Sequence, residues 1–220
     1  MRRFKSIEFT MVLLSGLWLM GCEPTPKKEQ PLNVLMISID DLNDWVGALG
    51  AYPYVQTPNI DRLANEGILF TNAHCQAPIC GPSRASILSG LRPSTTGIYG
   101  QIKDQNIRKG STLMESVLFL PEYFKDNGYK TIGVGKIFHN HAPDGIFEVS
   151  GGRIGGFGPR PKKRIKWNKE GTSTDWGAYP KEDSLMSDYN YAQWTKKQLE
   201  QKHDRPFFMA VGFIRPHVPW

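Results

Sequence analysis

The sequence is short of three things: cysteines, long hydrophobic runs and internal repeats. It has 3 cysteines among 220 residues, so no more than one disulfide can form within the chain. Its most apolar stretch covers residues 9–20 and is too short to span a bilayer comfortably. The lack of a repeat excludes a solenoid or a propeller array. Because 40% of the residues are hydrophobic, we expect one medium-sized domain or an incomplete piece of a larger one.

The surplus of positive charge is modest and lies in two places. The formal net charge is +6, with one share near the start of the chain and a second in residues 159–169. No recognisable nucleic-acid-binding module accompanies either share. A run of lysines in a segment rich in glycine and proline is more simply explained as solvated, although contact with an anionic substrate is an alternative. We therefore expect no nucleic-acid partner.

The first residues of the chain are typical of an exported lipoprotein. A basic start precedes the apolar run, which suits the core of a signal peptide. The ending LMGC resembles the bacterial lipobox, which implies cleavage before Cys22 and lipid on its sulfur and new N-terminus. An ordinary signal peptide or a membrane anchor is the alternative. We predict a signal peptide at 1–21 and a lipidated Cys22 with a polar tether at 22–31, which would hold the domain on a bacterial membrane, in the periplasm or at the cell surface.

From residue 32 onward, the pattern alternates between strands and helices. The run LNVLMISI at 32–39 is typical of a strand buried on both faces. Thr57, Pro58 and Gly67 mark the start and end of a helix that precedes a second strand at 68–73. Further elements are expected at 82–89 (helix), from Thr112 through Pro121 to Gly128 (helix), at 129–138 (strand), from Ser187 (helix) and at 206–214 (strand). The alternation predicts a layered α/β domain with a mostly parallel sheet.

A long segment between two of these elements, residues 140–185, has no clear period. It is rich in glycine, proline, tryptophan and charge. A loop of this length in a compact domain is usually functional or mobile.

Polar side chains follow three of the predicted strands. They are, in chain order, Asp40 and Asp41, Lys136 and His139, and Arg215 and His217. Ligands of open α/β sheets gather at the carboxyl ends of strands, so these groups predict one pocket for a divalent metal and an anionic sulfate or phosphate group. Each has a simpler explanation when taken alone: a capped or solvated turn for the aspartates, and a loop or packed position for the histidines.

Cys80 opens the tight stretch CGPSR. At the start of a short helix, its thiol would feel the positive end of the helix dipole, and Arg84 could reach back toward it, which makes a nucleophile plausible. A disulfide with Cys75 and a buried structural thiol are open alternatives. A zinc site that includes His74 is disfavoured by the spacing.

These motifs together resemble the sulfatase family. CGPSR at 80–84 matches the pattern CxPSR, and its longer form continues as CGPSRASILSGLRPSTTGIY. NVLMISIDDL resembles the opening strand with its paired metal-binding aspartates, and GKIFH and RPHVPW match later blocks. The spacing of Lys136 and His139, with LPEYFKDNGY and FFMAVGFIRPHVP, is most similar to the iduronate-2-sulfatase subgroup. The resemblance runs from about residue 32 to the last residue.

The resemblance implies an alkaline-phosphatase-like α/β fold and hydrolysis of a sulfate ester on a sugar, as in glycosaminoglycan degradation. Cys80 would be oxidised by a maturation enzyme to Cα-formylglycine, and the hydrated aldehyde would attack sulfur. Asp40, Asp41 and residue 80 would hold Ca²⁺.

The resemblance also implies roles for four other residues. Arg84 would orient the ionised diol, and His139 would assist its proton transfers. Lys136 and His217 would bind sulfate oxygens. The family continues past the point where this sequence stops, with further metal ligands and a second lysine, so we expect 32–220 to be an N-terminal portion that is inactive alone. A phosphate or phosphonate ester hydrolase of the same superfamily, and a non-catalytic lipoprotein that binds sulfated glycans, are the alternative functions.

Overall fold

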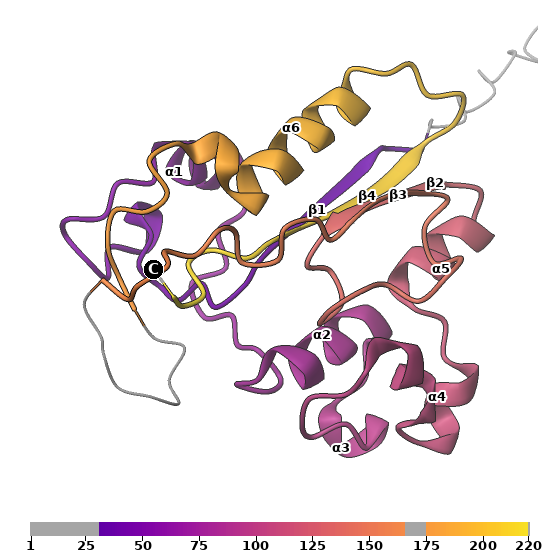
Figure 1. The fold of residues 1–220 in the computed structure, drawn as a ribbon. Coiled ribbons are helices and arrows are strands. Elements are labelled where there is room, and N and C mark those ends of the chain that lie inside the picture. Colours follow the sequence, from indigo (N-terminus) through magenta and orange to yellow (C-terminus); the bar gives the residue numbers. More distant parts are fainter. Residues whose placement is uncertain (1–30, 166–174, 220) are drawn as a thin grey trace, which may run out of the picture. The chain divides into compact units, whose positions relative to one another are not determined.

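The computed structural model describes residues 31–165 and 175–219. The predicted signal peptide, with Cys22 and nearly all of the predicted tether, therefore lies outside the described residues. In the described part, a four-stranded sheet has the order β1-β4-β2-β3, and every pair of neighbouring strands is parallel (Figure 1). The strands are β1 (Val34–Ile39), β2 (Lys130–Gly135), β3 (Val149–Gly152) and β4 (Phe207–Phe213).

Strand β4 packs on both of its faces. Phe208 and Ala210 belong to the core on one face. Phe207, Met209 and Val211 belong to the core on the other face. Burial of one large apolar side chain contributes about 1.5–3 kcal/mol, so an uninterrupted apolar run is stable only where both faces are covered.

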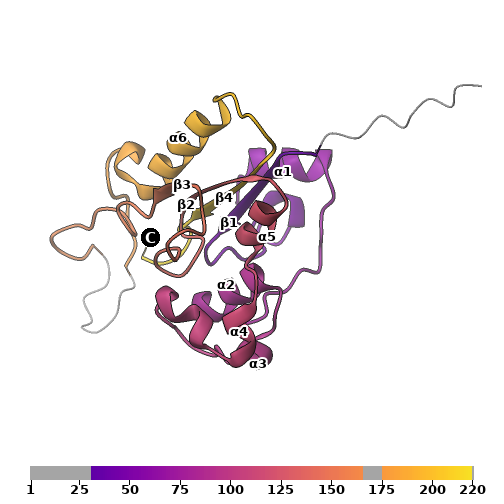
Figure 2. The same ribbon diagram turned by 90° about the vertical axis from the view of Figure 1, so that its right-hand side faces the viewer.

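Helices provide this cover on both sides of the sheet. Helix α6 (Ser187–Leu199) lies on one face, and α2 (Cys80–Ser89) and α5 (Leu120–Asp126) lie on the opposite face (Figure 2). On that face, Phe124 of α5 stacks on Phe208 of β4, with ring centroids 4.4 Å apart. The predicted layered α/β architecture is confirmed. None of the helices in the described residues is both long enough and apolar enough to cross a membrane.

Most of the predicted elements are present with small shifts at their ends. The strands predicted at 32–39, 129–138 and 206–214 correspond to β1, β2 and β4, and the helix predicted from Ser187 is α6. The predicted burial of 32–39 on both faces is wrong, because β1 is an outer strand of the described sheet and its Leu35 and Ile37 side chains are exposed. The helix predicted after Thr57 is α1 (Pro58–Glu66), which begins with Pro58 in its first turn. The Thr57 hydroxyl does not cap this helix but accepts a hydrogen bond of 2.8 Å from the N–H of Gly47.

Two predicted elements are wrong. No strand forms at 68–73, and this segment pairs with no strand among the described residues. Ile68 and Phe70 are instead 84% and 75% exposed. The helix predicted to continue through Pro121 is divided into α4 (Thr112–Ser116) and α5. A proline lacks the N–H that a continuous helix requires, but it is tolerated in the first turn, where α5 places it.

Several short elements have no counterpart in the predictions. They are α3 (Pro93–Thr96), the 3₁₀ helices η1 (Gly47–Leu49), η2 (Asp104–Lys109) and η3 (Asp183–Leu185), and strand β3 inside the predicted loop at 140–185. Strand β3 was missed because its sequence, VSGG, is short and half glycine, a composition that normally disfavours strands.

A pair of glycines lets β2 and β4 approach closely where they end. Gly135 has a φ of +83°, and a Cβ at this position would lie 2.2 Å from the carbonyl oxygen of Gly212. The next residue, Lys136, donates its N–H to that oxygen at 2.7 Å. This close approach sets where Lys136 leaves the sheet.

We expect Gly135→Ala to lower the free energy of unfolding by more than about 3 kcal/mol, because it adds a steric clash to an unfavourable backbone conformation. Gly128→Ala is the matched control, since Gly128 has a φ of +84° but open space around its Cβ position. That control should cost only about 1–2 kcal/mol. Urea denaturation of both variants measures the difference, and equal losses would contradict the proposed role of the close approach.

Candidate active site

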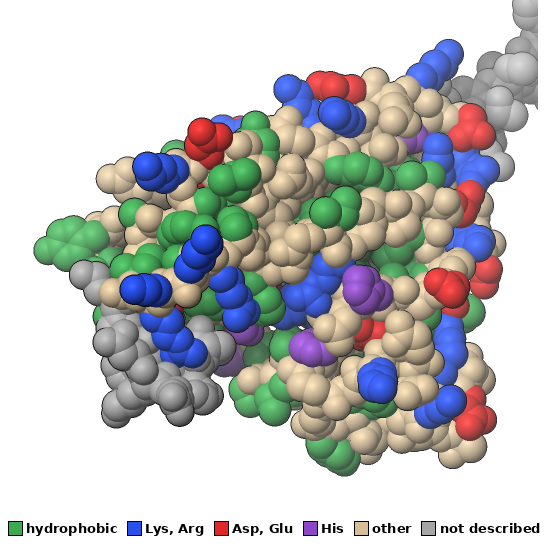
Figure 3. Space-filling model, viewed as in Figure 1, with side chains coloured by type: hydrophobic (Ala, Val, Ile, Leu, Met, Phe, Trp, Pro, Cys, Tyr) green, Lys and Arg blue, Asp and Glu red, His purple; other side chains and the backbone are tan. Residues whose placement is uncertain are grey.

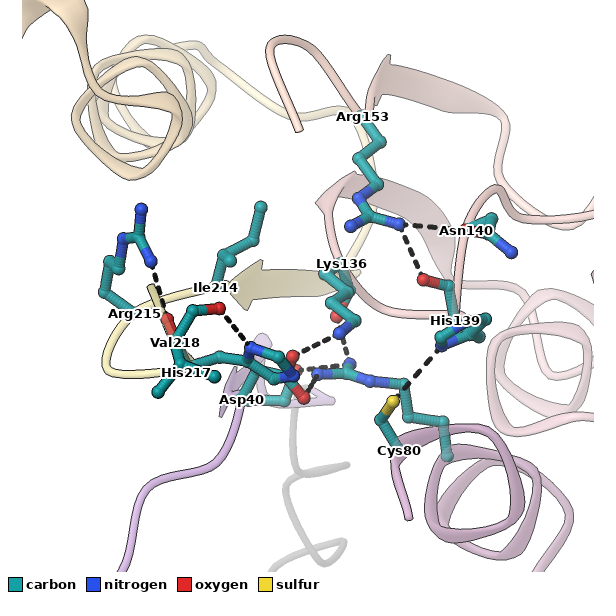
Figure 4. Close-up of polar contacts among 12 residues, drawn as sticks. Asp40, Cys80, Lys136, His139, Asn140, Arg153, Ile214, Arg215, His217 and Val218 are labelled. Carbon is teal, nitrogen blue, oxygen red and sulfur yellow. Dashed lines mark hydrogen bonds and ion pairs between the residues drawn. The ribbon is translucent and has the colours of Figure 1, made fainter. Parts of the chain in front are cut away.

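Three strands end at one edge of the sheet, and the residues that follow them lie together. Strand β4 lies between β1 and β2, with Gly135 of β2 opposite Gly212 of β4. Asp40 follows β1, Lys136 follows β2, and their side chains form an ion pair (Figure 4). The structure thus places these two side chains together, as the strand-end pattern predicts.

Asp40 is the centre of a buried cluster of charges. Its carboxylate pairs with Lys136 through Oδ2, and Oδ1 accepts a hydrogen bond of 3.0 Å from Arg84 Nη2. The side chain of Lys136 is only 1% exposed. Burial by itself would raise the pKa of Asp40, but the hydrogen bond from Lys136 and the charges of both basic groups outweigh it and hold that pKa below its ordinary value. Asp40 is therefore a carboxylate with a cation at each oxygen.

The Arg84 guanidinium points at the sheet and not at Cys80. It contacts the carbonyl oxygen of Lys136, and Nη1 lies 3.2 Å from the carbonyl oxygen of Ile137. The hydrogen bonds of the described residues include none between Arg84 and Cys80, so the predicted reach back toward the thiol is not seen. The acceptors at the strand ends, above all the Asp40 carboxylate, draw the guanidinium away.

Cys80 is the first residue of α2, two residues before the start of the helix predicted at 82–89, and its side chain faces two polar groups. Its Sγ lies 3.3 Å from His139 Nδ1 and accepts a hydrogen bond of 2.9 Å from Gln101 Nε2. Cys80 and Cys75 are both free thiols, so the disulfide alternative does not hold in this structure. The thiol is half-buried and next to a histidine, which is a suitable environment for a reactive group.

His139 is held from its backbone as well as its side chain. The buried carboxylate of Asp104 accepts hydrogen bonds from the N–H groups of His139, Asn140 and His141, at 3.1, 2.6 and 3.0 Å. Burial lowers the pKa of His139, and the positive charge of Lys136 lowers it further, against a smaller opposing effect of Asp104. A neutral imidazole that can accept a proton is therefore favoured near neutral pH.

A cavity of about 660 Å³ joins most of the predicted site. Its lining includes Asp40, Asp41, Cys80, Arg84, Gln101 and His217. Its size is in the usual range for a small-ligand site. Lys136 and His139 do not line this cavity but contact residues that do: Lys136 is buried and pairs with Asp40, and His139 contacts Cys80. Figure 3 shows histidine and basic side chains gathered around a hollow on one face.

The segment after β4 holds His217 at the cavity. The carboxylate of Asp188, in the first turn of α6, accepts hydrogen bonds from the backbone N–H groups of Ile214 and Arg215, at 2.9 and 2.8 Å. Arg215 does not reach the pocket predicted for it, because its guanidinium binds the carbonyl oxygens of His217 and Phe157 at 2.6 and 2.7 Å. The Nδ1 of His217 is 2.7 Å from the carbonyl oxygen of Val218, which leaves Nε2 as the ring nitrogen that can contact a ligand.

The predicted metal ligands line one cavity but do not converge. In residues 31–165 and 175–219, no three His, Cys, Asp or Glu side chains are close enough to hold a metal ion. Asp40 is turned toward Lys136 and Arg84. Asp41 is exposed and has a φ of +59°, an uncommon value for a residue other than glycine that often marks a functional turn. The zinc site considered for His74 and Cys75 is also not formed.

Sequence reasoning missed Gln101, Asp104, Asp188 and Arg153. Arg153 donates a hydrogen bond to the carbonyl oxygen of His139 at 2.6 Å. All four act on residues that are distant in the sequence, and none stands in a motif. Only the long segment without a period, in which Arg153 lies, carried a signal of function.

Comparison with known proteins gives one family. The sulfatase family model matches residues 32–220. A sulfatase from Formosa agariphila is 48% identical over 94% of this chain and 44% of its own length. Human iduronate 2-sulfatase is 34% identical over 86% of this chain and 36% of its own length. The chain thus spans less than half the length of these relatives.

Solved structures agree on the fold. The phosphonate monoester hydrolase of Agrobacterium radiobacter has a TM-score of 0.55 to this chain, with 22% sequence identity, and the match covers 86% of this chain and 42% of that one. At this level of identity, the likeness concerns the arrangement of strands and helices alone.

Proposed function

The chain belongs to the sulfatase family, and we propose that the protein carrying it removes sulfate from a sulfated saccharide by hydrolysis. The family resemblance read from the sequence is confirmed, as is the alkaline-phosphatase-like fold. The observation that supports the proposal most is the position of Cys80. It opens CGPSR, begins α2, lines the cavity and contacts His139.

We propose that residue 80 works as a formylglycine. A separate maturation enzyme would bring a two-electron oxidant that oxidises the Cβ of Cys80; the C–S bond would break, the sulfur would leave as hydrogen sulfide, and oxygen from water would take its place to give an aldehyde. A second water would add to give a diol. One hydroxyl would attack sulfur and the ester S–O bond would break, releasing the alcohol with a proton. The second hydroxyl would then lose its proton as the C=O bond re-forms and sulfate leaves, so that hydration of the aldehyde restores the diol.

His139 is the proposed acceptor of these protons, because its imidazole is 3.3 Å from Cys80 Sγ and its pKa is lowered. Lys136 and His217 would bind sulfate oxygens: the Lys136 amine lies at the strand edge and His217 on the cavity wall. Arg84 would support the site through Asp40 and the strand ends, and not by contact with residue 80.

The donor chemistry of this edge suits Ca²⁺. Asp40 and Asp41 carry carboxylate oxygens, the ligands that this ion prefers, and both line the cavity together with residue 80. Because the Asp40 oxygens are paired with Lys136 and Arg84, this carboxylate would have to turn from these cations toward the ion. Ca²⁺ takes about 6–8 oxygen ligands, so water or parts of the protein outside the described residues would supply the others. A bound calcium ion would supply positive charge next to the sulfate group. The residues described here would hold the ion and position the nucleophile.

For the substrate, we propose a sulfated uronic acid in a glycosaminoglycan or a related polysaccharide, on the strength of the 34% identity to iduronate 2-sulfatase. Specificity would come in part from residues 140–185. Export and lipid attachment at Cys22 belong to the same proposal and depend on the sequence of residues 1–31.

Mass spectrometry of the peptide that contains residue 80 tests the modification. The full-length protein, co-expressed with a maturation enzyme, should carry an aldehyde at residue 80 and should hydrolyse sulfate esters faster than matched phosphate esters. Parallel kinetics on the two esters decide between sulfatase and phosphatase chemistry. An unmodified thiol with no sulfate-ester turnover, or a preference for phosphate, would overturn the proposal.

A further inference from the structure

Two residues of the segment 101–104 touch the proposed catalytic groups, although neither stands in a motif. Gln101 binds Cys80, and Asp104 binds the backbone that carries His139. We propose that this segment completes the active site: Gln101 is a catalytic residue that donates a hydrogen bond to the reacting atom of residue 80, and Asp104 is a positioning residue for His139. This inference rests on the proposed sulfatase function.

The contact of Gln101 is made with the atom that reacts. Its Nε2 is 2.9 Å from Cys80 Sγ, the position that an oxygen on the Cβ of residue 80 would occupy after the proposed modification. His139 Nδ1 is 3.3 Å from the same atom. A hydrogen-bond donor and a proton acceptor thus flank one atom. The Gln101 amide would fix the direction of the attacking oxygen and stabilise the negative charge that develops on it.

Gly81 makes this contact possible. A Cβ at position 81 would lie 2.3 Å from Gln101 Oε1 and 3.3 Å from Gln101 Cα. A larger residue at position 81 would therefore displace the amide from Cys80. The pattern CxPSR leaves position 81 open, so the glycine found here is explained by the close passage of Gln101 and not by the modification motif.

Asp104 fixes the other side of the reacting atom. Its side chain is buried, with the residue 2% exposed, and three consecutive N–H groups from His139 to His141 point at its carboxylate. Arg153 binds the carbonyl oxygen of His139 at 2.6 Å. With its N–H and C=O both bound, His139 keeps its backbone fixed while its ring faces Cys80. The short run from Gln101 to Asp104 therefore sets the positions of both partners of residue 80.

Hydrogen exchange tests the positioning role without requiring activity. In the full-length protein, Asp104→Asn should speed amide exchange in the peptide that spans residues 139–141 on the order of 10-fold, because it removes acceptors from these N–H groups. Asp144→Asn is the control, since Asp144 is an exposed carboxylate that lines a neighbouring cavity. Unchanged exchange in Asp104→Asn, or an equal change in Asp144→Asn, would overturn the role of Asp104.

Steady-state kinetics test the catalytic role of Gln101. In the matured protein, Gln101→Met keeps the size of the side chain but removes its donor, and it should lower kcat about 10²-fold with KM unchanged. Gln105→Met, one residue beyond this segment, is the control. Gly81→Ala should reproduce the loss, and the double variant should be no worse than either single variant. The rate of each variant is normalised to its fraction of aldehyde at residue 80.

Asp104→Asn should also lower kcat, and Asp104→Glu, which keeps the carboxylate, should restore part of it. Wild-type turnover with no loss in Gln101→Met, or a change in KM alone, would overturn the inference while the proposed function stands. Absence of sulfate-ester turnover in the wild type would overturn the proposed function, and with it the catalytic role of Gln101.

Discussion

Replacement of Cys80 by alanine is expected to abolish sulfate-ester hydrolysis in the full-length protein. The side chain at this position supplies the proposed nucleophile, and loss of a nucleophile typically lowers kcat by at least about 10³-fold. The fold should survive, because Cys80 is half-buried and its removal leaves only a small space. The measurement is kcat on a sulfated saccharide, with the melting temperature as a check on folding.

Cys75→Ala is the matched control. Cys75 is the other free cysteine of the described residues, and it lines the same cavity but is exposed. Its replacement should leave kcat close to that of the wild type. Turnover retained by Cys80→Ala, or equal losses in both variants, would show that residue 80 is not the nucleophile.

Replacement of Asp40 by asparagine should lower the free energy of unfolding of the protein by about 3–5 kcal/mol. The change removes the only negative charge that faces both Lys136 and Arg84 in the buried cluster of the described residues. Two cations would then stay buried without their partner, which typically costs about 3–5 kcal/mol. Asparagine keeps nearly the same volume, so the loss reports charge and not packing. Urea denaturation in the presence of a chelator measures the free energy of unfolding without a contribution from bound metal.

Asp41→Asn provides the comparison. Asp41 is the adjacent carboxylate but is exposed, and asparagine tolerates its left-handed backbone conformation. Its free energy of unfolding should stay within about 0.5 kcal/mol of the wild type. If the two variants lose equal stability, the buried cluster does not hold the strand ends together.

The sequence was sufficient to locate the core of the site because one simple rule applies to it. Asp40 and Lys136 are 96 residues apart, yet each directly follows a parallel strand, and residues in that position share one edge of the sheet. Apolar runs such as 206–214 are recognisable without any structure. The fold class follows from the same runs and from the helices between them.

The remaining contacts depend on packing that no local pattern records. Asp104 and the N–H groups it binds are separated by 35 to 37 residues, and Gln101 is 21 residues from Cys80. The direction of Arg84 was predicted wrongly for a related reason. A helix start and a spacing of one turn allow contact with Cys80, but a stronger acceptor, Asp40, is visible only once the strands are assembled.

The place of β4 in the sheet also sets the order in which the protein can assemble. β4 is the last of the described strands in the sequence but stands between β1 and β2, and a hydrogen bond from Phe207 to Asn33 closes a separation of 174 residues. Ribosomes add about 5–20 residues per second, so β1 leaves the ribosome roughly 10 to 30 seconds before the strand that pairs with it. Asp40 and Lys136 therefore meet only at a late stage of synthesis. Such a distant pairing predicts slow folding.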